Sequence, residues 1–155
     1  MPFLKPATAC AASLLAMCPV LAHAETCQGT PTTAKLEIVI EGVHSSRGLM
    51  TASIYPGDRS QFLIKNGAWK VWSVPATSPA THMCIWLKFG PGTYAFAVYH
   101  DANSNGKWDH SLLGAIEGFG FSNNPRTLFS APSYDQVKFQ ATGPSTTLHV
   151  RLRYP

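Results

Sequence analysis

Apolar and polar residues alternate in several short segments of the chain, which is the pattern of half-buried β-strands. Leu36, Ile38 and Ile40 share one face of residues 35–41. Residues 93–99 are apolar on both faces, which predicts a central strand. The other segments for which the pattern predicts strands are 49–55, 69–74, 81–89, a short segment at Val137 and Phe139, and 148–154.

These strands predict an all-β fold, because no segment shows a convincing helical period. We expect an immunoglobulin-like β-sandwich of about seven strands, with one long loop near residues 100–135. A β-barrel remains the alternative, since periodicity alone does not separate the two architectures. The loop is expected to cap one end of the sandwich, where the binding loops of this architecture lie.

Composition limits the function classes. The chain has 155 residues, of which 45% are hydrophobic and 13% charged, and this is the composition of a folded domain. Residues 25–155 are expected to form a single domain. The formal net charge is +4, but the basic residues are scattered, so no nucleic-acid partner is expected.

The first residues have the three parts of a secretory signal peptide. Lys5 supplies a positive start, residues 9–21 are apolar, and Ala22-His23-Ala24 is a small-x-small cleavage site. We therefore expect residues 1–24 to be removed near Ala24, leaving a periplasmic or secreted protein. The apolar stretch is shorter than the roughly 20 residues that span a bilayer, and an uncleaved anchor is the alternative. No transmembrane segment is expected in the mature chain.

Cleavage would leave Cys27 and Cys84, an even number in an oxidising compartment. Cys84 alternates away from the apolar face of residues 81–89, where a lead-in segment carrying Cys27 could cross it. A disulfide between them is predicted, and two free thiols are the alternative.

The strongest chemical motif is Asp101-x-Asn103-x-Asn105-Gly106-x-x-Asp109, which matches the first nine positions of a calcium-binding loop. Calcium takes six to eight oxygen ligands, and the acidic and amide side chains can supply them together with the carbonyl of Lys107. Leu112 stands where a helix-loop-helix site has a bidentate Glu, and Glu117 is the nearest downstream carboxylate. We therefore expect weak calcium binding at Asp101, Asn103, Asn105, Lys107, Asp109 and Glu117. The alternative is a turn held by its own hydrogen bonds.

The chain also resembles a bacterial family of exported proteins known as domain of unknown function 2141. The resemblance covers about residues 35–153 and rests on Tyr99-His100-Asp101 with the loop above, on Glu117-Gly118-Phe119-Gly120-Phe121, and on Ser122-Asn123-Asn124. It implies a small β-sandwich in which His100, Ser122, Asn123 and Asn124 form one feature with the loop. It implies no activity, cofactor or substrate.

Three functions follow as hypotheses. The first is a non-catalytic exported module that binds a ligand or partner, with calcium stabilising the loop. The second is a structural envelope protein that works through strand-edge pairing. The third is a periplasmic metal-assisted hydrolase using His100, Asp101 and Glu117. Without a nucleophile motif, the sequence favours a protein that is not an enzyme.

Overall fold

The computed structural model describes residues 26–111, 114–126 and 130–155. The predicted signal peptide lies outside these residues. The strands are β1 (Lys35–Glu41), β2 (Leu49–Pro56), β3 (Lys70–Pro75), β4 (Ala80–Trp86), β5 (Gly92–Asp101), β6 (His110–Ser111), β7 (Gly114–Ala115), β8 (Phe119–Phe121), β9 (Phe139–Ala141) and β10 (Ser145–Arg151). Two single helical turns, η1 (Arg59–Gln61) and α1 (Tyr134–Val137), complete the described elements.

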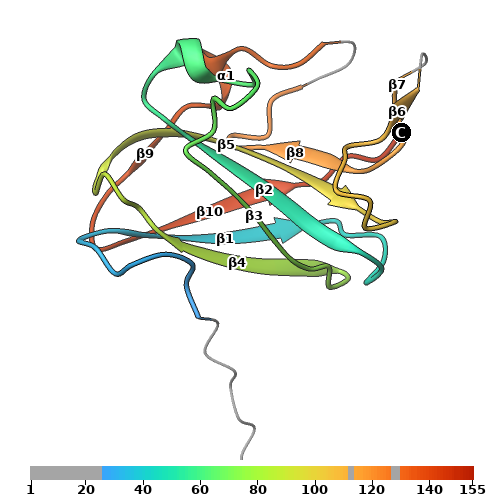
Figure 1. Cartoon of the computed structure of the whole chain (residues 1–155), viewed down its shortest axis with the longest axis horizontal. Helices are drawn as coiled ribbons and strands as arrows, with labels where there is room; N and C mark the ends of the chain where they lie inside the picture. The colour runs from blue at the N-terminus through green and yellow to red at the C-terminus, as the bar shows by residue number, and fades with distance from the viewer. Residues whose placement is uncertain (1–25, 112–113, 127–129) are drawn as a thin grey trace, which may run out of the picture.

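The strands form an all-β sandwich. One sheet has the order β10-β1-β4, and the other has the order β3-β2-β5-β8 with β9 also paired to β5. The two sheets lie as layers, one above the other in Figure 1, with the β6–β7 hairpin at one end and α1 towards the other. The two main sheets are not paired with each other and each has edge strands, so the structure favours the sandwich over the barrel.

The core lies between the sheets and contains the apolar faces that the alternation predicts. Leu36, Ile38 and Ile40 are at most 1% exposed, and Met50, Ala52 and Ile54 are fully buried. β5 is central, because it pairs antiparallel with β2 on one side and with β8 and β9 on the other. β1 and β10 pair in parallel, so the first and last long strands of the described chain lie side by side.

The predicted long loop near residues 100–135 contains more regular structure than the sequence pattern indicates. It contains β6, β7 and β8, and α1 lies at its end. β8 is only Phe-Gly-Phe, too short to show a period, and it forms because β5 offers a free strand edge. Val137, predicted to begin a strand, ends α1 instead, and the strand begins at Phe139.

Phe89 belongs by position to the apolar face predicted for residues 81–89, but the structure does not bury it. Its place in the alternation predicts burial, yet it is 56% exposed. β4 ends at Trp86, so the turn that follows carries Phe89 out of the core and against Trp69, with ring centroids 5.6 Å apart.

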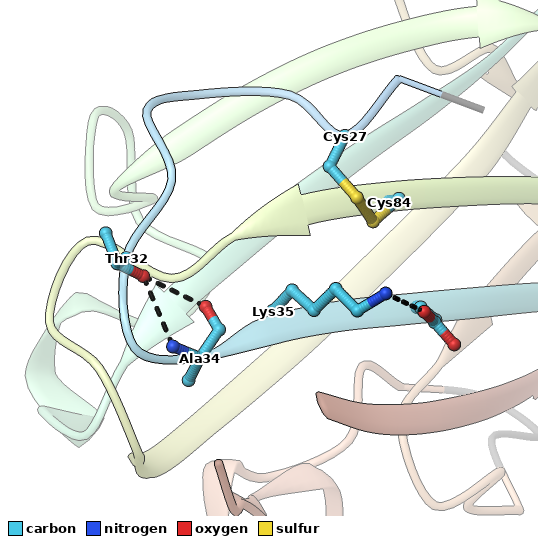
Figure 2. The surroundings of a disulfide bond; sticks show 6 residues. Cys27, Thr32, Ala34, Lys35 and Cys84 are labelled. Atoms are coloured by element: carbon cyan, nitrogen blue, oxygen red, sulfur yellow. Dashed lines mark hydrogen bonds and ion pairs between the residues drawn. A yellow bond between two sulfur atoms is a disulfide. The ribbon is translucent and has the colours of Figure 1, made fainter. Parts of the chain in front are cut away.

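The lead-in segment that carries Cys27 runs beside β4, at the edge of the three-stranded sheet (Figure 2). Gln28 pairs with the edge of β4, donating to the carbonyl of Cys84 and accepting from the N–H of Trp86, both at 2.9 Å. This places Cys27 over Cys84, and the predicted disulfide is confirmed, with 4.5 Å between the Cα atoms. No helix in the described residues is long and apolar enough to cross a membrane.

Candidate loop-end site

Asp101 ends β5 and organises the loop that follows it. Its side chain is completely buried, and its two carboxylate oxygens accept the backbone N–H groups of Asn105 at 3.0 Å and Gly106 at 2.8 Å. Gly106 has φ +74°, in the region that glycine adopts without strain. The carboxylate therefore holds the sharp turn of the loop in place.

The amide side chains continue the same network. The Oδ1 atoms of Asn103 and Asn105 accept the N–H groups two residues ahead, at 3.1 and 2.8 Å. Their side-chain nitrogens both donate to Oδ2 of Asp109, at 2.8 and 3.0 Å. The side chains of the motif thus bond one another and the loop backbone, and the two amide groups are oriented by these hydrogen bonds.

Glu117 returns to the loop from beyond the β6–β7 hairpin. It is 6% exposed, and its oxygens accept the N–H groups of Ala102 at 2.9 Å and Asp109 at 3.0 Å. One carboxylate therefore joins the two ends of the Asp101–Asp109 loop. Lys107 is exposed, and its backbone N–H donates to Oδ1 of Asn105.

Asp101, Asp109 and Glu117 bring three carboxylates together at the loop, and none of them takes part in an ion pair within the described residues. Asp101 and Glu117 are the only buried carboxylates in the described residues. The ion pairs of the described chain join Lys35–Glu37, Arg59–Asp135, Lys138–Asp135, His149–Glu41 and Arg151–Glu41, and none includes a carboxylate of the loop. Within the same residues, no three His, Cys, Asp or Glu side chains lie close enough together to hold a metal ion.

His100 directly precedes Asp101 in β5, so the two side chains point to opposite faces of the strand. It is 2% exposed, with Nε2 2.7 Å from the carbonyl oxygen of Arg47 and Nδ1 2.8 Å from the hydroxyl of Tyr154. A carbonyl only accepts, so Nε2 donates, and in the neutral ring Nδ1 accepts from Tyr154. Burial raises the pKa of Tyr154, while the N–H that His44 donates to its oxygen opposes this, so the hydroxyl keeps its proton.

A hollow of about 310 Å³ lies beside the loop. Three separate segments of the chain and the C-terminal Tyr154 form it, and its lining includes Arg47, Asp109, Ile116 and Glu117. His44 stacks on Tyr154 with the ring centroids 3.7 Å apart. Sequence reasoning missed His44, Arg47 and Tyr154, because no local motif marks them and only the fold brings them together.

Ser122, Asn123 and Asn124 do not join the loop. Ser122 is fully buried and bonds the N–H of Phe96 and the carbonyl of Val137. Asn123 donates to the carbonyls of Gln136 and Lys138, and Asn124 bonds the backbone of His149 and Arg151 on the free edge of β10. This segment ties β5, α1 and β10 together, so its polar groups stabilise the fold.

We expect Ser122→Ala to lower the free energy of unfolding by about 2 kcal/mol, since it leaves the buried N–H of Phe96 without an acceptor. Urea unfolding followed by circular dichroism measures this loss. The exposed Ser130→Ala serves as the control and should change stability by less than about 0.5 kcal/mol. Equal stability of the two variants would contradict the structural role of Ser122.

The tryptophans do not form one surface. Trp72 lies in the core, Trp69 packs against it, and Trp108 is 43% exposed beside Phe119. Trp69 and Trp72 therefore contribute to core packing and need no ligand to account for their positions.

Comparison with known proteins places the chain in a family. A search of curated proteins and a search of solved structures each found no match. A family model described as "Uncharacterized protein conserved in bacteria (DUF2141)" matches residues 38–149, which is more than half of the chain and includes the loop and the Ser122–Asn124 segment. The protein belongs to this family of uncharacterised bacterial proteins.

Proposed function

We propose that the protein is an exported, non-catalytic module that binds a ligand or partner at the loop end of the sandwich, with calcium as a weak ligand of the Asp101–Asp109 loop. The observation that carries this proposal is the pair of buried carboxylates, Asp101 and Glu117. Neither takes part in an ion pair within the part of the chain that the structure describes, and Glu117 lines a preformed hollow. Buried charges are usually paired or bound to a metal.

Export is supported by two observations. Cys27 and Cys84 form a disulfide, and such bonds persist in oxidising compartments. Residues 1–24 have the pattern of a secretory signal peptide. Periplasmic and secreted locations are both compatible with these features.

The absence of catalysis is supported by how the polar groups near the hollow are used. Each oxygen of Asp101 and Glu117 accepts a backbone N–H, and both ring nitrogens of His100 have partners. These contacts fix the backbone, and the sequence offers no nucleophile motif beside them.

Calcium would have to compete with the hydrogen bonds of the loop. The amide nitrogens of Asn103 and Asn105 point at Asp109, so binding through the amide oxygens requires both groups to turn. Carboxylate oxygens retain spare lone pairs after accepting one N–H, so Asp101 and Asp109 remain able to bind. We therefore expect a dissociation constant on the order of 10⁻⁴–10⁻³ M.

At about 10 mM calcium, binding of this strength should stabilise the protein by about 1.4–2.7 kcal/mol relative to EDTA. Differential scanning calorimetry of the purified protein measures the change as a higher unfolding midpoint. Asp101→Asn is expected to lose the response. The matched control is Asp135→Asn, since Asp135 is exposed and lies in ion pairs with Arg59 and Lys138, so this variant should keep the response. Identical midpoints in calcium and EDTA would remove the calcium part of the proposal.

A further inference from the structure

The hollow beside the loop has walls of opposite charge. Arg47 and His44 come from the segment between β1 and β2, whereas Asp109 and Glu117 come from the loops before and after the β6–β7 hairpin. Arg47 is exposed and Asp109 is half-buried, and neither takes part in an ion pair within the described residues. Opposite charges therefore line one hollow without neutralising each other at contact distance.

The walls are held in position by contacts with one another. The carbonyl of Arg47 accepts from the buried ring of His100, and Tyr154 joins the same ring to the backbone of His44. On the other side, Glu117 bonds the N–H groups at both ends of the acidic loop. A hollow that exists before binding loses little conformational entropy when a ligand enters.

The size of the hollow limits the ligand. About 310 Å³ is at the lower end of the range of roughly 300–1,000 Å³ for small-molecule sites. The exposed side chain of Ile116 lines the same hollow and offers it one apolar surface. A ligand that satisfies both walls must carry a positive and a negative group within the span of this hollow.

We propose that the hollow binds a small zwitterion of the amino-acid type, with its carboxylate at Arg47 and its ammonium group at Asp109. The guanidinium fork matches a carboxylate with two parallel hydrogen bonds. Asn103 and Asn105 both donate to Oδ2 of Asp109, so among the described hydrogen bonds Oδ1 remains able to receive an ammonium group. The inference rests on the proposed function, because it names the ligand class of the same loop-end site.

Isothermal titration calorimetry with three matched compounds tests the ligand class. L-Alanine carries both charges, N-acetyl-L-alanine keeps only the carboxylate, and L-alaninamide keeps only the ammonium group. A charged hydrogen bond contributes about 1.5–3 kcal/mol, so removing either charge should weaken binding at least about tenfold. Equal binding of L-alanine and N-acetyl-L-alanine would show a simple anion site and overturn the proposal.

Two variants test the walls separately. Arg47→Gln and Asp109→Asn are each expected to weaken L-alanine binding at least about tenfold. Arg126→Gln removes an exposed arginine elsewhere and should leave binding unchanged. If L-alanine fails to bind, the zwitterion proposal is wrong, and the calcium response of the same sample then decides separately whether the proposed function stands.

Discussion

Replacing both Cys27 and Cys84 with Ser is expected to lower the free energy of unfolding by about 4 kcal/mol. The bond closes a loop across 57 residues, and in the chain-entropy model a loop of this length restricts the unfolded chain by that amount. Cys84 is only 9% exposed, so the native packing around it should change little when sulfur becomes oxygen. Urea unfolding of the oxidised protein and of the double variant measures the difference.

A matched control separates the effect of losing the disulfide from the effect of changing the two side chains. Reducing the unaltered protein with dithiothreitol should produce the same loss, and the reduced double variant should not lose more. Because the lead-in segment also pairs with the edge of β4 through Gln28, we expect the sheet to remain folded. A double variant within about 1 kcal/mol of the oxidised protein would contradict the entropic role.

The long strands could be predicted because each has a clear period of two. The faces of β1 and β2 are buried as the alternation predicts, and the sidedness of Cys84 correctly indicated the disulfide. Phe89 shows the limit of this reasoning, since alternation does not tell where a strand ends. β8 shows a second limit, because three residues become a strand only through their partner β5.

The acidic loop was partly visible in the sequence for a different reason. Asp101, Asn103 and Asn105 are close in sequence, so their shared loop follows from spacing alone, and Glu117 is the nearest downstream carboxylate. The hollow could not be predicted, because Arg47 and Tyr154 are more than 100 residues apart and meet only when β1 and β10 pair. The Ser122–Asn124 segment looked like part of the same feature, yet its partners lie on other elements.

Gly48 is where the turn before β2 approaches the backbone at the end of β5. It precedes β2 with φ +71°, and a Cβ atom there would lie against the carbonyl oxygen of Asp101 and 2.7 Å from the Cα of Ala102. Both obstacles are backbone, so neither moves aside as a flexible side chain would. We expect Gly48→Ala to lower the free energy of unfolding by roughly 3–5 kcal/mol, from the clash and the left-handed backbone together.

Gly106→Ala is the matched control for this effect. Gly106 has nearly the same backbone angle, φ +74°, but its Cβ would meet nothing within 4 Å. Gly106→Ala should therefore lower the free energy of unfolding only through backbone strain, by about 1–2 kcal/mol. Urea unfolding of both variants isolates the close approach at Gly48, and equal losses would show that the turn and the acidic loop are not in contact. Since the clash would move the turn that carries Arg47 away from the acidic loop that carries Asp109, Gly48→Ala should also weaken L-alanine binding in the fraction that remains folded.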